Sequence, residues 1–496
     1  MTSDFKPITD LTRLVDAIVT DGVSGPVDGV TVTDITADSR RIVPGALFVA
    51  VRGTGVDGHT FIPAAVKAGA GVIVAEHFED DYPGVTCITV PDSAVALGYL
   101  ASRYYGDPSR RLHLVGVTGT NGKTTIATLM YDMARLHGET AGLLSTVVNR
   151  IDTRAVPATH TTPDPLELNR LLREMVDAGC TFAAMEVSSH ASAQHRIAGL
   201  HFAGGVFTNL TRDHLDYHKT VQAYLAAKKA FFDGLPSEAF ALTNADDRNG
   251  AVMVQNTAAR PVTCYSVRGE ADFRVRVLDD TLEGMTLEIN GREVHTMFVG
   301  HFNASNLAAV YGAMVLSGYD PEEVLVNLSL LRPVAGRLQT FRSATGITAI
   351  VDYAHTPDAL HNVLETLNEI DREGGRIITV CGCGGNRDAG KRPQMALEAA
   401  TLSDRVILTS DNPRDEDPEE ILAQMRAGLT PHELARTETI TDRREAIRAA
   451  VAMAAPGDII LVAGKGHEDY QIIRGVKHHF DDREEVCRAL GIPTAS

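Results

Sequence analysis

The chain has 496 residues, which suggests about three domains at roughly 100–200 residues each. Hydrophobic residues make up 44% and charged residues 22% of the chain, as in ordinary globular proteins. The formal net charge of −18 argues against a protein that binds nucleic acid or an anionic membrane surface, because such proteins need a basic face.

The first hundred residues predict a small α/β unit. Asp10 can cap a short helix, and four short apolar runs bounded by Gly, Pro or Asp follow it. Residues 105–109 (YGDPS) are polar and rich in turn formers, which indicates a linker and a first domain over residues 1–108. The four runs cover residues 30–35, 46–51, 71–75 and 86–90.

Fully apolar runs recur from residue 112 onward. Residues 112–117, 181–187 and 205–210 are each followed by polar residues and separated by segments of helix length. Apolar strands that alternate with helices predict a parallel sheet covered on both faces. We therefore expect a central α/β domain over residues 109–335 that is built on such a sheet.

A third set of apolar runs predicts a Rossmann-like α/β domain over residues 336–496. In open α/β sheets, ligands bind at the carboxyl ends of the strands. Here the runs at 347–351, 376–380, 405–409 and 458–462 each end in an unusual polar turn. These turns are DYAHTPD, CGCGGNRD, SDNPRDEDP and AGKGHED.

The chain shows no targeting or membrane signal. Residues 1–7 lack a basic segment followed by an apolar one, and no apolar run approaches the roughly 20 residues of a membrane span. We therefore expect a cytoplasmic protein. The six cysteines fit neither a zinc site nor a disulfide framework. Cys381 and Cys383 are typical of small residues at a strand end, with a metal or redox role as the alternative.

The strongest local signal is a phosphate-binding loop, GVTGTNGKTT, over residues 116–125. In this context Lys123 would reach the phosphates of a bound nucleotide and the Thr124 hydroxyl would ligate Mg²⁺. The generic pattern G-x-x-x-x-G-K-[ST] has Gly where this chain has Val117, so the loop departs from it there. The residues expected to contact ATP here are Thr118, Gly119, Thr120, Asn121, Gly122, Lys123 and Thr124.

Glu186 and His214 are candidates for a metal site, and a pair of lysines follows them in the chain. Glu186 ends an apolar strand, where a carboxylate beside a phosphate loop usually serves the metal, with a solvated strand end as the alternative. His214 lies in the polar stretch TNLTRDHLDYH, where a loop histidine is more often structural than a metal ligand. Lys228 and Lys229 are adjacent on a predicted helix and point about 100° apart, so spacing alone does not favour either.

These motifs together resemble one family. The segments GTNGKTT, MEVSSH, TNLTRDHLDYH, AAK, HFNASN, GRLQ, DYAHTPD and GKGHE occur in this order between residues 119 and 468. This series is similar to that of the Mur ligases, which build the cell-wall peptide on a UDP-sugar carrier. The resemblance is dense over roughly the last 390 residues and weaker before them, where Asp38-Ser39-Arg40 is the anchor.

The resemblance implies an ATP-dependent ligase whose three domains bind a UDP-sugar, ATP and an amino acid. It assigns catalysis to Lys123, Glu186, His214 and Lys228, with Mg²⁺ held by the last three and Thr124. Lys228 matches a lysine that the family carbamylates with CO₂. Asn303, Asn306, Arg337 and Asp352 match further ATP contacts. The positions that match contacts to the UDP-muramoyl dipeptide are Ser39, Thr161, Thr162, Ser188, Gln194 and Arg196.

The segment Asp411-Asn412-Pro413-Arg414 resembles the signature of Mur ligases that add meso-diaminopimelate to UDP-N-acetylmuramoyl-L-alanyl-D-glutamate. The distal end of that amino acid carries a carboxylate and an ammonium, whereas lysine carries only the ammonium. Arginines can pair with the carboxylate and would repel a bare ammonium. By itself, the segment could also be an ordinary turn. The remaining positions that the resemblance assigns to this amino acid are Arg387, Gly464 and Glu468.

Other functions compete with this interpretation. An L-lysine-adding Mur ligase is the nearest alternative, and Arg414 argues against it. A folylpolyglutamate-type ligase would also have a phosphate loop and a modified lysine, but has no need of DNPR and GKGHE. A nucleotide-driven switch or motor would not need Glu186, His214 and a lysine at one metal site. A binding module that has lost catalysis is argued against by the intact Lys123, Thr124, Glu186 and Lys228.

Overall fold

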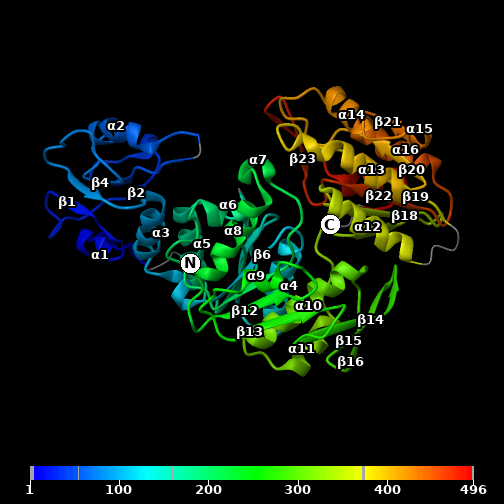
Figure 1. Cartoon of the computed structure of the whole chain (residues 1–496), viewed down its shortest axis with the longest axis horizontal. Coiled ribbons are helices and arrows are strands. Elements are labelled where there is room, and N and C mark those ends of the chain that lie inside the picture. The colour runs from blue at the N-terminus through cyan, green and yellow to red at the C-terminus, as the bar shows by residue number, and fades with distance from the viewer. Residues whose placement is uncertain (1–4, 54, 159, 371–374, 494–496) are drawn as a thin grey trace.

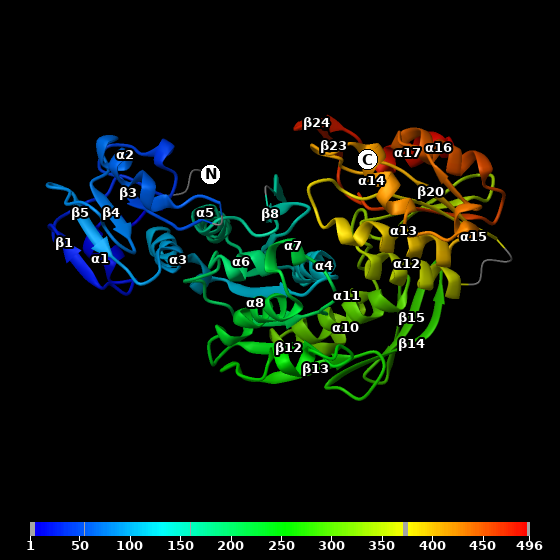
Figure 2. The ribbon, with the colours of Figure 1, turned by 45° about the horizontal axis from the view of Figure 1, so that its top comes forward.

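The computed structural model describes residues 5–53, 55–158, 160–370 and 375–493. The molecule is elongated, and three units, each built on its own β-sheet, follow one another in chain order (Figure 1). The central unit lies between the other two, and the C-terminal unit stands above one end of it in both views (Figure 2). Among the described residues no helix is long and apolar enough to cross a membrane.

The N-terminal unit is a five-stranded sheet in the order β1-β5-β4-β3-β2. Asp10 caps α1 through a hydrogen bond from the Thr12 amide, as the sequence predicts. The prediction of a strand over residues 30–35 is wrong. Only the last residue of this run belongs to a strand, the two-residue β2. The elements are β1 Gly22–Ser24, β2 Ile35–Thr36, β3 Leu47–Val49, β4 Val72–Ala75, β5 Thr86–Thr89, α1 Leu11–Val15, α2 Ile62–Lys67 and α3 Ser93–Tyr104.

The central sheet has eleven strands in the order β16-β15-β14-β13-β12-β11-β6-β10-β7-β8-β9. Its middle, from β7 to β14, is parallel as predicted. Both edges are antiparallel extensions that the apolar runs do not predict. The strands are β6 His113–Thr118, β7 Ala141–Leu144, β8 Asn149–Ile151, β9 Arg154–Val156, β10 Phe182–Glu186, β11 Gly204–Phe207, β12 Phe240–Asn244, β13 Val262–Ser266, β14 Phe273–Thr281, β15 Gly284–Ile289 and β16 Arg292–Thr296.

Helices cover both faces of the central sheet. One core cluster joins the sheet to α4 and α10, and a second joins its other face to α5 and α8. Burial of both faces explains why its middle strands are apolar without alternation. The helices are α4 Lys123–Leu136, α5 Pro165–Asp177, α6 Ser189–Ala193, α7 Leu215–His218, α8 Val221–Asp233, α9 Gly250–Met253, α10 His301–Leu316 and α11 Pro321–Leu328.

The C-terminal sheet has the order β17-β18-β22-β19-β20-β21, with β17 antiparallel and the others parallel. Its two faces are covered by α12–α14 and by α16 and α17. The elements are β17 Gln339–Arg342, β18 Thr348–Asp352, β19 Ile377–Cys381, β20 Arg405–Leu408, β21 Thr437–Thr439, β22 Ile459–Ala463, the hairpin β23 Tyr470–Ile473 and β24 Val476–His479, α12 Pro357–Glu369, α13 Arg392–Leu402, α14 Pro418–Arg426, α15 Pro431–Leu434, α16 Arg443–Met453 and α17 Asp482–Leu490.

A fully buried ion pair joins α16 to α17. Arg443 donates to both carboxylate oxygens of Asp482 at 2.8 and 2.7 Å, and also to the Ala463 carbonyl at 2.9 Å. We expect Asp482→Ala to lower the free energy of unfolding by about 3–5 kcal/mol, because it leaves a buried guanidinium unpaired. Urea denaturation measures this change. In the matched control Glu445→Ala, which removes an exposed pair with Arg448, the loss should stay below about 1 kcal/mol.

Candidate active site

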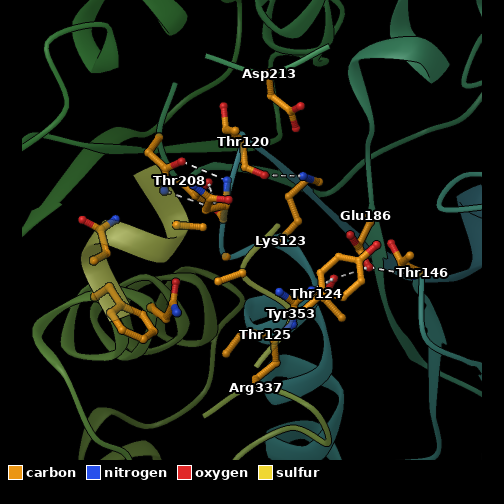
Figure 3. A pocket seen from close by; sticks show the side chains of 18 of the residues that line it. Thr120, Lys123, Thr124, Thr125, Thr146, Glu186, Thr208, Asp213, Arg337 and Tyr353 are labelled. Atoms are coloured by element: carbon orange, nitrogen blue, oxygen red, sulfur yellow. Dashed lines mark hydrogen bonds between the residues drawn. The ribbon is translucent and has the colours of Figure 1, made fainter. Parts of the chain in front are cut away.

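A cavity opens where the central strands end and faces the C-terminal unit (Figure 3). Its walls come from the loops after β6, β10 and β11, the first turns of α10, and residues 352–363 of the C-terminal unit. This position at the carboxyl ends of parallel strands is the one that the sequence predicts. The predicted site residues that line it are Thr120, Asn121, Gly122, Lys123, Thr124, Thr161, Glu186, Ser188, His214, Lys228, Asn303, Asn306, Arg337 and Asp352.

The loop between β6 and α4 has the geometry of a phosphate cradle. Thr118 ends β6, and α4 begins at Lys123, so free amides at the helix N-terminus face the cavity. Gly119 has a φ of +153°, and a Cβ there would lie 1.8 Å from the Thr208 hydroxyl. Gly122 has a φ of +89° and packs against Asn306. Only glycine therefore fits both positions, which explains the sequence pattern despite Val117.

Two lysines converge on this loop. The Lys123 amine donates to the carbonyls of Gly119 and Thr120 at 2.9 and 2.8 Å, and Lys228 donates to the same Gly119 carbonyl at 2.5 Å. Lys228 is 1% exposed. Burial and the nearby Lys123 charge hold the pKa of Lys228 well below its ordinary value. Lys229, by contrast, lies outside the lining of the cavity and pairs with Asp233, so the structure separates two lysines that sequence spacing could not.

Glu186 has one carboxylate oxygen without a partner among the described residues. Oε1 accepts hydrogen bonds from the Thr124 hydroxyl at 2.9 Å and the Thr146 amide at 2.7 Å, whereas the buried Oε2 accepts none (Figure 3). An unpaired buried carboxylate oxygen beside a hydroxyl fits a hard divalent cation such as Mg²⁺. In the described part of the chain, no three His, Cys, Asp or Glu side chains form a ready metal cluster. A metal ion beside Glu186 and Thr124 would therefore need further ligands that a preformed cluster of these side chains does not supply.

His214 lies at the cavity wall in a strained conformation. Its φ is +54°, an uncommon value for a residue other than glycine, and such strain often marks functional sites. Burial lowers the pKa of His214 to about 4, although the adjacent Asp213 carboxylate at 3.3 Å opposes this shift. The ring is therefore neutral near pH 7, which is the form that can ligate a metal. His218 does not face the cavity but contacts the Ser189 hydroxyl at 2.9 Å.

Asn303 and Asn306 lie on one face of the first turns of α10. Asn306 donates to the Asn303 side chain at 3.1 Å, and Asn303 donates to the Val299 carbonyl at 2.9 Å. Both are buried and line the cavity beside Phe302. Two amides next to an aromatic ring suit the polar edge and flat face of a purine base.

The C-terminal unit contributes an arginine to the phosphate side of the cavity. Arg337 donates to the Thr124 hydroxyl at 3.3 Å and stacks over the Tyr353 ring at 4.6 Å (Figure 3). The buried Asp352 carboxylate accepts from the amides of Leu338 and Ala354 at 2.8 and 2.7 Å. It thus fixes the segment that carries Arg337. The contact to Thr124 shows that both units form one site.

Five of the six predicted UDP-substrate residues form a connected network. Arg196 donates to the Gln194 side chain and, at 2.8 Å, to the Thr162 carbonyl. The Thr162 hydroxyl donates to the Glu186 carbonyl and accepts from the Ser188 amide. Thr161 accepts from the Thr146 hydroxyl at 3.1 Å. The structure does not bring Ser39 to this network, because Ser39 lies in the N-terminal unit next to the Asp38–Arg40 ion pair.

The predicted amino-acid residues form a second cluster in the C-terminal unit, outside the lining of this cavity. Arg414 and Arg387 both approach Gly384: a Cβ there would lie 2.8 Å from Arg414 Nη1 and 3.8 Å from Arg387 Cγ. Arg414 has a φ of +53°, and main-chain hydrogen bonds to the β23–β24 hairpin hold it there. Pro413 is buried.

The acidic side of this cluster is built around Glu468. Asn412 donates to Glu468 at 2.8 Å, so two members of the predicted set touch. Asp411 and Gly464 lie next to each other, since a Cβ on Gly464 would stand 4.0 Å from an Asp411 oxygen. Gly464 has a φ of +118°, which side chains rarely adopt. The cluster therefore presents arginines and carboxylates near one turn.

Sequence reasoning missed several residues of the cavity. Tyr353 and His355 lie within the DYAHTPD turn, in which the resemblance assigns an ATP contact only to Asp352. Thr208 and Asn209 lie within TNLTRDHLDYH, and Asn209 accepts from the Asn121 amide at 2.9 Å. The signal in the sequence that could have indicated these four residues is their position at or just after the end of a predicted strand. Thr146, Asn362 and Val363 come from segments with no motif, so no local pattern indicates them.

Comparison with protein families then decides the identity. Three Mur ligase models match the chain: the family's catalytic domain at residues 31–105, its middle domain at 117–314 and its glutamate ligase domain at 336–466. The chain belongs to the Mur ligase family. It is thus an ATP-dependent, amide-bond-forming ligase, as the sequence motifs predict.

Several curated Mur ligases are similar over nearly their full length. A UDP-N-acetylmuramoyl-L-alanyl-D-glutamate–2,6-diaminopimelate ligase of Parabacteroides distasonis is 62% identical over 460 residues, which cover 92% of this chain and 94% of the relative. A protein of the same name from Geobacillus kaustophilus is 44% identical, over 91% and 93% of the two chains.

Solved structures agree with the family. One of a UDP-N-acetylmuramoyl-L-alanyl-D-glutamate–2,6-diaminopimelate ligase superposes with a TM-score of 0.69 at 34% identity, covering 98% of this chain and 99% of the other. A MurF ligase of Thermotoga maritima in complex with ADP gives 0.60 at 19% identity, over 92% and 96%. A folylpolyglutamate synthase of Mycobacterium tuberculosis gives 0.59 at 18%, over 75% and 93%. The MurF ligase and the folylpolyglutamate synthase are similar to this chain in fold alone.

Proposed function

We propose that this ligase adds meso-diaminopimelate to the D-glutamate of UDP-N-acetylmuramoyl-L-alanyl-D-glutamate, at the expense of ATP, in the synthesis of peptidoglycan precursors. The observation that carries the proposal is the convergence of Arg387 and Arg414 on Gly384, beside the Asn412–Glu468 contact. Arginines suit the distal carboxylate of diaminopimelate, and Glu468 suits its distal ammonium. The similarity to relatives of that name supports the same substrate.

Each unit has one substrate in this proposal. Residues 1–108 bind the UDP-sugar with Ser39, residues 109–335 bind ATP, and residues 336–496 bind the amino acid. The Arg196 network then holds the muramoyl dipeptide near Glu186, because Thr162 contacts both residues. Among the described residues no carboxylate is hydrogen-bonded to Arg196, which donates to Gln194 and Thr162 and so can serve an anionic substrate.

The reaction needs an activated carboxylate. ATP would transfer its γ-phosphoryl group to a carboxylate of the dipeptide and release ADP. The neutral amine would then attack the acyl phosphate, and phosphate would leave from the tetrahedral adduct as the nitrogen loses a proton. Lys123 and Arg337 lie where negative charge gathers on the transferred phosphoryl group, and the helix N-terminus at Lys123 adds oriented amides. Closure of the cavity between two units would exclude water from the acyl phosphate.

Glu186 and Thr124 would hold Mg²⁺, together with His214 and a carbamate on Lys228. The metal would offset the charge of the phosphates and polarise the oxygen under attack. The Lys228 amine is suited to carbamylation, because burial lowers its pKa and only a neutral amine adds CO₂. The amines of Lys123 and Lys228 both donate to the Gly119 carbonyl. A carbamate on Lys228 would replace one of these two amines with a negative charge beside Lys123.

Release of phosphate from ATP tests the proposal. The enzyme is supplied with the UDP-dipeptide and, in parallel, with meso-diaminopimelate, L-lysine or no amino acid. Release that requires diaminopimelate supports the proposal. Release with lysine alone would keep the family and reject the substrate, and release without any amino acid would favour a nucleotide-driven switch.

A further inference from the structure

Lys465 is a fully buried lysine to which no role has been given so far. It is 0% exposed, and its amine lies 3.2 Å from Glu468 Oε2 and 3.5 Å from Asp411 Oδ1. The amine also lies 5.5 Å from the centre of the Tyr470 ring. A buried ammonium needs opposite charge beside it, and two carboxylates lie beside this one.

The backbone places this amine with little freedom. Lys465 follows β22 and stands between Gly464 and Gly466, with φ values of +118° and +53°. A Cβ on Gly466 would lie 2.6 Å from the Gly336 carbonyl and 2.7 Å from Tyr353 Cβ, so this turn packs directly against the segment that carries Arg337. The backbone at Lys465 is therefore set by the fold, and burial and the two carboxylates hold the amine in place.

The charges of the cluster show what the amine does. Asp411 and Glu468 together carry two negative charges, whereas the distal end of diaminopimelate offers one ammonium. Lys465 compensates one of the two, which leaves one negative charge for that ammonium. Glu468 accepts its hydrogen bonds from Asn412 and Lys465 on Oε2, so Oε1 is the oxygen left for a ligand among the described residues.

We propose that Lys465 is a positioning residue of the amino-acid site, which holds Asp411 and Glu468 side by side and leaves the pair with a single negative charge for one substrate ammonium. This role rests on the proposed function. Lys465 touches both carboxylates but is closed to solvent, so it acts through them rather than on the substrate.

Loss of this amine should make amino-acid binding depend on pH. Burial and the Asp411 charge already raise the pKa of Glu468, while Lys465 and Asn412 oppose the shift. Other groups facing the pair are the charged Arg414 and Arg443 and the buried His355 around Asp411, and Tyr353 and Tyr470 around Glu468. Without Lys465 the pKa of Glu468 rises further, and its protonated form cannot pair with an ammonium.

The test compares Lys465→Met with the wild type between pH 6 and 9. At pH 7 we expect the KM for diaminopimelate to rise at least ~10-fold, with the KM values of ATP and UDP-dipeptide within about twofold. The ratio of the variant's KM to the wild-type KM should fall as pH rises, because Glu468 regains its charge. Lys465→Arg, which retains the charge, should give a ratio that does not change with pH.

The matched control is Lys477→Met, because the Lys477 amine lies 3.7 Å from the centre of the same Tyr470 ring but is exposed. It should leave all three KM values unchanged. A KM ratio for Lys465→Met that is independent of pH, or an equal rise in all three KM values, would overturn the proposal. If Lys465→Met does not fold, Lys465→Gln carries the same test. Wild-type turnover with lysine alone would instead reject the proposed function.

Discussion

Lys228→Ala should lose at least ~10³-fold in kcat, equivalent to about 4 kcal/mol of transition-state stabilisation. The variant lacks the only atom on which the proposed carbamate can form, and thus one ligand of the metal. Lys228 is also buried against the phosphate loop, where its amine contacts the Gly119 carbonyl at 2.5 Å. Steady-state phosphate release under saturating substrates measures the loss.

The adjacent lysine provides the control for this variant. Lys229→Ala removes an ion pair with Asp233 outside the cavity and should keep kcat within about twofold. With ¹³C-labelled CO₂, a carbamate signal should appear in the NMR spectrum of the wild type and of Lys229→Ala but not of Lys228→Ala. Normal turnover in Lys228→Ala would refute the carbamate assignment.

Arg414→Ala should reduce kcat/KM for diaminopimelate by about 100-fold, because loss of one buried charge-assisted contact costs about 3 kcal/mol. Arg414 lies beside Gly384 and donates to the Gly385 carbonyl at 2.8 Å, outside the lining of the nucleotide cavity. The KM for ATP should therefore stay within about twofold of the wild-type value. Initial rates with each substrate varied in turn give both quantities.

The exposed Arg448, which pairs with Glu445, supplies a matched arginine for comparison. Arg448→Ala should leave both kinetic parameters unchanged. If Arg414→Ala weakened ATP and diaminopimelate equally, Arg414 would not belong to the amino-acid site.

The parallel cores of the fold could be predicted because their strands are buried on both faces. Residues 112–117, 181–187 and 376–380 are nearly continuous apolar runs, and the observed β6, β10 and β19 begin and end within about one residue of them. The antiparallel β14–β16 could not be predicted this way. β14 alternates buried and exposed residues over its first four positions and has no buried residue after them, so a search for apolar runs does not detect it.

The candidate site was predictable where one motif supplies both the turn and the chemistry. The loop around Gly119 and Lys123 is an example, since its glycines and its lysine serve the same cradle. The choice of Lys228 over Lys229 depended on tertiary burial, which neighbours in sequence cannot reveal. The role of Lys465 depended on two carboxylates, one of which lies 54 residues away in sequence at Asp411.

The most direct test of the proposed function is a competition. The enzyme is given ATP, the UDP-dipeptide and equal concentrations of meso-diaminopimelate and L-lysine, and mass spectrometry counts the two UDP-tripeptide products. One ion pair to the distal carboxylate predicts an excess of the diaminopimelate product of about 100-fold. Equal amounts of both products, or an excess of the lysine product, would contradict the assignment of the Arg414 cluster to the diaminopimelate carboxylate.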